Sequence, residues 1–161
     1  MLAPVSVGSD HMSSVSLAHK PSPPVTDLLA DLRDAHEKVL TAIDDMETAT
    51  QAAEPGGDLY PRARWRLSQA SRHRRVLVDA ICSELLKRVS AEEVKAIEAL
   101  RADGERRLRA SAAHVRTWTM ESINRDWRAY CRASAVIRAS MRERIASEKA
   151  VLDPLLSQYR K

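Results

Sequence analysis

The 92 residues between Pro61 and Pro154 contain no proline and a single glycine, Gly104. Sheets and tight hairpins rely on glycine or proline at their turns, so an interval of this kind argues against both. Alanine, leucine, arginine and glutamate dominate it, and these residues favour helices. The sequence therefore predicts an all-α protein and argues against doubly wound nucleotide folds, barrels and sandwiches.

The chain divides into two parts. Residues 1–24 are rich in serine and proline without an apolar period, which predicts a flexible tail, and they lack the pattern of a signal peptide. Residues 25–161 are long enough to bury a core, and short connections favour an antiparallel up-down-up-down four-helix bundle. The expected helices span residues 26–54, 59–89, 91–118 and 120–153.

Local signals set the ends of these helices. Pro55-Gly56-Gly57 should end the first helix, and Ser90 with Glu93 forms a capping box for the third. Thr119 is a suitable N-cap for the fourth, which Pro154 should end or kink. Gly104 weakens the third helix relative to alanine, and a bend is expected there.

The expected core positions repeat every three or four residues. In the first helix they are Leu29, Leu32, His36, Val39, Ile43 and Met46. In the second they are Leu67, Ala70, Arg74, Leu77, Ile81 and Leu85. In the third they are Val94, Ile97, Leu100 or Arg101, Leu108, Ser111 and Val115. In the fourth they are Ile123, Trp127, Tyr130, Ser134, Ile137, Met141, Arg144, Glu148 and Leu152.

Four polar residues on these stripes form the predicted internal network: His36, Arg74, Arg144 and Glu148. Burying such groups without partners costs several kcal/mol, so they should face one another, a bound ion or water. His36 lies near the start of the first helix and Glu148 near the end of the last. In antiparallel helices these positions fall at similar levels.

Charge is unevenly distributed. Residues 27–54 carry eight acidic and two basic side chains, and residues 62–88 carry the reverse. Two neighbouring helices of complementary charge are the first interpretation. The alternative is a nucleic-acid or anion binder, with these candidate contacts: Arg62, Arg64, Arg66, Arg72 and Arg75. Nucleic acid is disfavoured because the net charge is only +4 and few aromatic residues lie nearby.

Other features point to a cytoplasmic protein. Cys82 and Cys131 have no metal-type spacing and are expected to be reduced thiols. No apolar stretch approaches the roughly 18 residues of a membrane span, so no membrane partner is expected. No familiar catalytic motif occurs, so the chain is not expected to be an enzyme.

Two segments carry a family resemblance. LLADLRDAHEKVLTAIDDME at residues 28–47 and MRERIASEKAVLDPLL at residues 141–156 resemble the first and last helices of hemerythrin-like (HHE, cation-binding) proteins. The resemblance covers these 36 residues and the four-helix layout between them. It implies a bacterial bundle whose relatives hold two iron ions.

The resemblance also supplies candidate metal ligands. His36 matches the first-helix ligand and Glu148 a last-helix carboxylate, while His73 and His114 are candidates on the second and third helices. The departures are that Arg144 stands where the last-helix histidine should be, and Lys149 where a second carboxylate often stands. Leu77 replaces the glutamate expected four residues after His73. Arginine cannot ligate a metal and repels cations.

These departures favour a hemerythrin-like bundle that has lost its metal site. Such a protein would need no cofactor and would act as a regulatory or interaction protein on a protein partner that the sequence does not identify. The alternative is a metal-binding member that carries or senses O₂, NO or iron.

The tail makes a first testable prediction. We expect deletion of residues 1–22 to leave the melting temperature almost unchanged, because this segment has no periodic apolar pattern that could dock on the bundle. Thermal unfolding of the full and shortened chains measures this, and a large drop would show that the tail is docked.

Overall fold

A computed structural model describes the backbone of residues 25–159 and the side chains of residues 28–159. The predicted tail of residues 1–24 and the first-turn side chains before Leu28 lie outside this part. The described residues form helices and no strand. The helices are α1 (Val25–Thr50), α2 (Leu59–Leu85), α3 (Ala91–Thr117), α4 (Met120–Arg125) and α5 (Trp127–Gln158).

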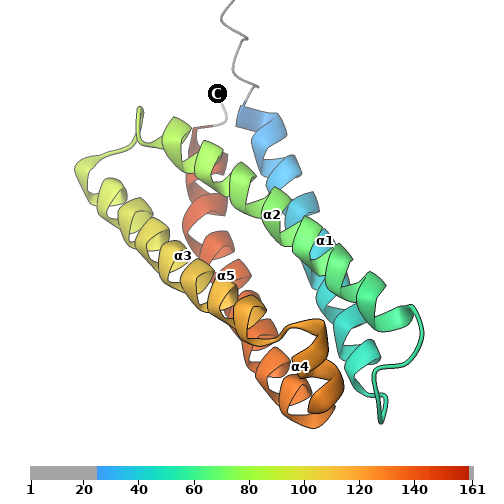
Figure 1. Ribbon diagram of the computed structural model, residues 1–161. Coiled ribbons are helices and arrows are strands. Elements are labelled where there is room, and N and C mark those ends of the chain that lie inside the picture. The colour runs from blue at the N-terminus through green and yellow to red at the C-terminus, as the bar shows by residue number, and fades with distance from the viewer. Residues whose placement is uncertain (1–24, 160–161) are drawn as a thin grey trace, which may run out of the picture.

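The predicted all-α fold is confirmed. Four long helices, α1, α2, α3 and α5, pack antiparallel to their neighbours along the chain (Figure 1). Helix α1 packs extensively against α2 and also against α5, while α3 packs on α5. All six expected core residues of α1 are buried. None of the described helices is long and apolar enough to cross a membrane.

The first two helices are shorter than predicted. Helix α1 ends at Thr50, and α2 ends at Leu85, four residues before the expected boundary. At the end of α1, the Thr50 hydroxyl donates to the Met46 carbonyl at 2.9 Å. The carbonyl of Ala52 accepts a hydrogen bond from Trp127 Nε1 at 2.8 Å, so a side chain of α5 uses a group that another helical turn would need.

The expected fourth helix is divided. It breaks at Asp126, whose backbone leaves the helical region and whose carboxylate accepts the Ala129 amide at 2.9 Å as the N-cap of α5. Of the two alternatives for Pro154, an end of the helix there is wrong, because α5 continues to Gln158. The last turn carries Leu155 and Leu156, whose burial in the core offsets the backbone hydrogen bond that proline cannot donate.

The predicted N-caps of α3 and α4 are confirmed. Ser90 Oγ accepts the Glu93 amide, and the Glu93 carboxylate accepts the Ser90 amide at 2.7 Å. Thr119 caps α4 by accepting the Ser122 amide at 3.2 Å. Helix α3 then runs continuously through Gly104 to Thr117.

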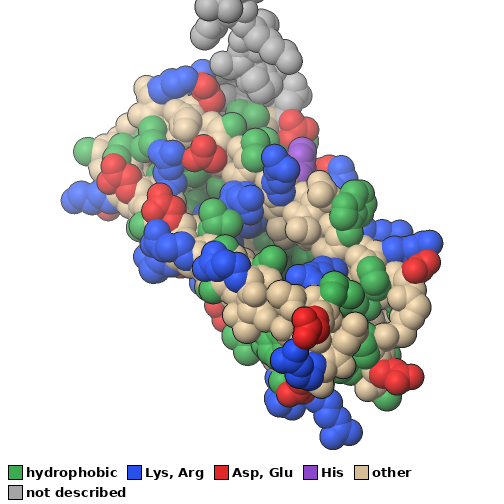
Figure 2. Space-filling model, viewed as in Figure 1, with side chains coloured by type: hydrophobic (Ala, Val, Ile, Leu, Met, Phe, Trp, Pro, Cys, Tyr) green, Lys and Arg blue, Asp and Glu red, His purple; other side chains and the backbone are tan. Residues whose placement is uncertain are grey.

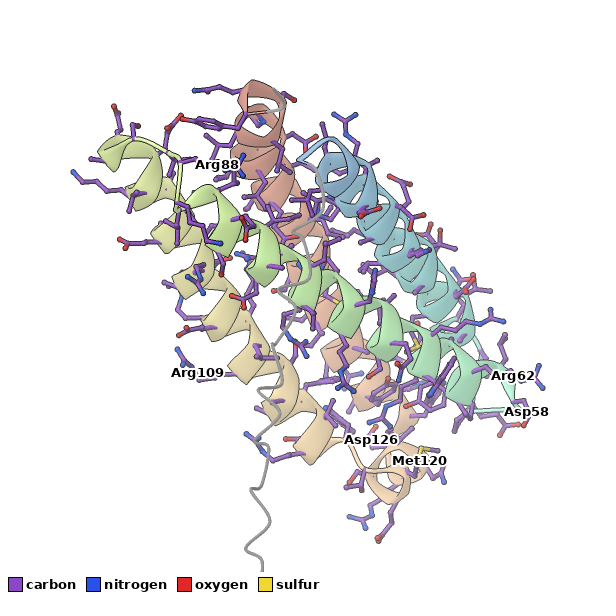
Figure 3. All side chains as sticks on the ribbon, turned by 90° about the horizontal axis from the view of Figure 1, so that it is seen from above. Asp58, Arg62, Arg88, Arg109, Met120 and Asp126 are labelled. Carbon is purple, nitrogen blue, oxygen red and sulfur yellow. The ribbon has the colours of Figure 1, made fainter. Side chains whose placement is uncertain are left out.

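Helices α2 and α3 make few contacts, which departs from a closed bundle. They are close at their shared connection near Arg88 and diverge toward the opposite end (Figures 1 and 3). Two expected core residues of α3 are consequently exposed, Leu108 at 42% and Val115 at 57%. An open groove lies between the two helices, with α5 as its floor.

The sequence suggested that the acidic α1 pairs with the basic α2, but most interhelical ion pairs of α1 are formed with α5. One ion pair joins α1 and α2 among the described residues, Arg66 to Asp45. The acids of α1 pair more often with α5, where Arg142 contacts both Asp44 and Glu47. Both cysteines are free thiols, and Cys82 is fully buried.

Candidate functional site

The carboxylate of Glu148 lies at the centre of the bundle and is 1% exposed. Its Oε1 accepts two hydrogen bonds, from Arg74 Nη1 at 2.5 Å and from Arg144 Nε at 2.7 Å. Its Oε2 lies 2.9 Å from Nε2 of His36, which is fully buried. The structure therefore brings together all four residues of the predicted internal network, from α1, α2 and α5.

The neighbouring apolar residues explain why these side chains meet. His36 lies between Leu32 and Val39 on the buried face of α1, and Glu148 lies between Ile145 and Leu152 on that of α5. The polar cluster thus separates two apolar clusters of the core. Helical spacing fixes its position, because residues three and four apart share one face.

The hydrogen-bond pattern indicates how His36 is protonated. Nδ1 of His36 is buried and has no partner among the described residues. A proton on Nε2 donates to Glu148 Oε2 and leaves Nδ1 as a bare acceptor, whereas a proton on Nδ1 would leave a buried donor without a partner. The geometry therefore favours the Nε2–H form of the ring.

The electrostatics keep Glu148 ionised. Burial alone raises the pKa of its carboxyl, but the hydrogen bond from His36 and the charges of Arg74 and Arg144 outweigh burial and lower that pKa. Because the pKa falls on folding, this carboxylate stabilises the protein fully above its unfolded pKa near 4.5. That stabilisation is lost as the pH falls through the folded pKa.

Arg144 connects this cluster to α3. Its Nη1 donates to the Leu100 carbonyl at 2.6 Å and to Asp103 Oδ2 at 3.2 Å. The guanidinium lies against the α3 backbone at Gly104, where a Cβ atom would stand 2.9 Å from Arg144 Nη2. The single glycine of the long proline-free interval therefore makes room for a buried arginine.

The network continues from Asp103 to the surface. Asp103 Oδ2 also accepts Arg107 Nε at 2.8 Å. Arg107 Nη1 in turn donates to the Ser140 hydroxyl at 2.8 Å and the Glu143 carboxylate at 3.2 Å. Charges of alternating sign thus link α5 to α3 from the bundle centre outward, which holds these two helices together.

The other predicted metal ligands lie elsewhere. His73 is exposed on α2, in a shallow depression against α1. His114 is near the end of α3, where its ring centroid lies 5.8 Å from that of Tyr130. Residues 28–159 contain no group of three or more His, Cys, Asp or Glu side chains placed to hold one metal ion. The donors that meet, His36 and Glu148, do not fit a di-iron centre, which needs several imidazoles and carboxylates.

Sequence reasoning missed four residues that matter here. Asp103 and Arg107 have an i,i+4 spacing that predicts an ion pair, but nothing local indicates that Arg144 joins them. Gly104 was interpreted as a weak point rather than as space for a side chain. Arg138 is 6% exposed, and its position four residues after Ser134 on the buried face of α5 was the available signal.

Comparison with protein-family models, with curated proteins and with solved structures found no match. The hemerythrin-like resemblance therefore depends on the residues quoted above.

The central ion cluster predicts a strong energetic coupling. We expect Glu148→Leu to lower the free energy of unfolding by about 3–5 kcal/mol, because it leaves the largely buried guanidinium of Arg74 without a carboxylate. We expect Arg144→Met to cost less, but well above about 0.5 kcal/mol, because Glu148 keeps its bonds to Arg74 and His36 while Asp103 loses a partner. The double variant should cost less than the sum of the two, since both charges are then absent. A double-mutant cycle by chemical denaturation measures the coupling.

The exposed pair of Arg125 and Glu121 is a matched control, because it has the same i,i+4 relation and side chains 72% and 82% exposed. Its coupling should be below about 1 kcal/mol. Single changes at Arg144 and Glu148 within about 0.5 kcal/mol of wild type would contradict a buried network.

Gly104 gives a second stability prediction. Alanine is favoured over glycine inside a helix by about 1 kcal/mol. We nevertheless expect Gly104→Ala to lower the free energy of unfolding, because the new Cβ meets a guanidinium that Glu148, Leu100 and Asp103 hold in place. In an Arg144→Met background the same substitution should stabilise. Denaturant titration of the four proteins tests this, and stabilisation in both backgrounds would contradict it.

Proposed function

We propose that the protein is a non-enzymatic, metal-free relative of the hemerythrin-like bundles and works by binding, as a cytoplasmic regulatory or interaction protein. One observation carries the proposal. Two guanidinium groups of the chain itself, from Arg74 and Arg144, donate to the carboxylate that the resemblance would assign to iron.

Charge supports this interpretation. Arg74 and Arg144 both pair with the buried carboxylate of Glu148, so the chain itself supplies the positive charge that a metal ion would otherwise bring. A metal ion at this position would have to displace two charge-assisted hydrogen bonds and then lie beside two positive charges. Among residues 28–159, His36 is the one imidazole in contact with Glu148, so the cluster supplies a metal ion with few ligands.

The absence of a reactive side-chain arrangement in the described part of the chain is consistent with a binding role. The hydroxyl of Ser134 is buried, and it accepts a hydrogen bond from Arg138 at 2.6 Å. No hydrogen bond joins it to a histidine among residues 28–159, so nothing there activates it by general-base catalysis. The groove between α2 and α3 instead offers a surface for a partner.

Metal analysis tests the proposal. We expect full-length protein purified from iron-supplemented cells to be colourless and to contain far less than one metal ion per chain, also after incubation with Fe²⁺ or Zn²⁺. The variant Arg144→His is a matched comparison, because it removes one cation and supplies an imidazole where the family has one. It should bind more Zn²⁺ than wild type.

Two outcomes would contradict the proposal. Two bound iron ions with a near-ultraviolet charge-transfer band would show an intact di-iron centre. One stoichiometric metal ion that is lost on His36→Ala would support the alternative, a hemerythrin-like protein that carries or senses O₂, NO or iron.

A further inference from the structure

The groove between α2 and α3 has a volume of about 910 Å³, within the size range of small-molecule sites. Its inner end reaches the Glu148 cluster, and its other end reaches Ser134, Arg138 and His114. Figure 2 shows Lys and Arg side chains gathered around the hollow on this face of the molecule. Nine arginines line the groove against three acidic residues.

Two buried arginines of α5 line this groove, and they differ in their hydrogen-bond partners. Arg144 and Arg138 are each 6% exposed. Arg144 contacts two carboxylates and a carbonyl, as described above. The one hydrogen bond of Arg138 among the described residues runs from Nη1 to Ser134 Oγ. Within residues 28–159 its Nε is buried without a hydrogen-bond partner, and no carboxylate forms an ion pair with it.

A buried guanidinium without an anion is costly, because it has lost its hydration and gained no opposite charge. Glu47 is the acid that acts on Arg138 electrostatically, but its carboxylate is bonded to Arg142 at 3.1 Å. Arg142 adds a positive charge near Arg138. Burial first, and then the positive charges of Arg64 and Arg138, lower the pKa of His114. This end of the groove therefore lacks one negative charge.

Apolar side chains also line the groove. Leu67 and Val78 of α2, Leu108 and Val115 of α3, and Ile137 and Met141 of α5 all line the groove. Leu108 and Val115 occupy positions that the sequence pattern assigns to the core, yet they are exposed there. A ligand that fits has an apolar body as well as a charge.

We propose that this groove binds a small organic molecule with one oxyanion group, a carboxylate or a phosphate, which pairs with Arg138 while its apolar body lies between α2 and α3. The inference rests on the proposed function, since it names the ligand of a protein that works by binding. The oxyanion accepts a charge-assisted hydrogen bond from the guanidinium of Arg138, whose Nη2 donates to no group among residues 28–159.

A nucleic acid fits this end of the groove poorly. Its phosphates are links within a continuous chain, so they reach a guanidinium that is 6% exposed less readily than the terminal oxyanion of a small molecule does. Single strands also bind by stacking bases on exposed aromatic rings, and Tyr130, the aromatic residue that lines the groove, is itself buried. Of the arginines suggested by the sequence, Arg62 and Arg66 pair with acids on the outer surface.

Calorimetric titration of the full-length protein tests the site with four probes: phenylacetate, phenyl phosphate, neutral phenylacetamide and inorganic phosphate. We expect one of the two organic anions to bind at one site per chain, and the preferred one identifies the head group. Phenylacetamide, which lacks the charge, and inorganic phosphate, which lacks the apolar body, should bind about tenfold more weakly or less.

Variants locate the contact. Arg138→Gln should weaken binding of the preferred anion by about tenfold or more. The matched control is Arg109→Gln, an exposed arginine of α3 outside the groove, which should change affinity by less than about twofold. Leu108→Glu, at a half-exposed wall position, should also repel the anion.

An NMR titration gives a second readout. Saturation with the anion should raise the pKa of His114, because the bound negative charge offsets the positive charge of Arg138.

Several results would overturn the proposal. They are equal binding of phenylacetamide and phenylacetate, equal effects of Arg138→Gln and Arg109→Gln, or no saturable binding of any probe. Tight, salt-dependent binding of a thymidine oligonucleotide that is unaffected by Arg138→Gln would assign the basic surface to nucleic acid instead. A metal-containing protein would refute the proposed function alone, because the anion titration reports on Arg138 independently of metal content.

Discussion

The carboxylate of Glu148 is the point on which the arrangement of this bundle depends. It is bonded to His36 of α1, Arg74 of α2 and Arg144 of α5, so a single buried charge fixes three helices relative to one another. Arg144 passes the constraint to α3 through Asp103. Breaking one such contact weakens the pairing of a charge in a low dielectric, whereas apolar side chains can shift against one another at smaller cost. The cluster therefore sets helix register more sharply than the surrounding leucines do.

The central cluster could be predicted because each member breaks a regular pattern. His36, Arg74, Arg144 and Glu148 occupy positions where the helical period demands apolar residues, and unpartnered polar groups there are too costly to persist. The period alone places them on inward faces, and antiparallel topology places them at one level. The same period predicted the buried face of α1, and all six of its expected core residues are buried.

The groove could not be predicted from helical periodicity, because it depends on how α2 and α3 lie relative to each other. Periodicity gives the inward face of α3 only if a neighbour covers it, and Leu108 and Val115 have the pattern of core residues without the cover. Helix ends show a similar limit. Pro154 breaks a helix by local rules, yet the burial of Leu155 and Leu156 keeps the last turn helical. In both cases tertiary packing overrides a local signal.

The distribution of charge connects the cluster to the groove. The carboxylates of Asp103 and Glu143, on α3 and α5, pair with Arg107 and Arg144. No ion pair to Arg138 is present among residues 28–159, and α2 contributes further arginines to the opposite wall. Like charges facing each other across a groove oppose its closure, which is consistent with the divergence of α2 from α3. An anion seated between the walls would remove this repulsion and supply the charge that Arg138 lacks. The chain thus balances its buried charge from within at Glu148, and at Arg138 the balance is left to a molecule from outside.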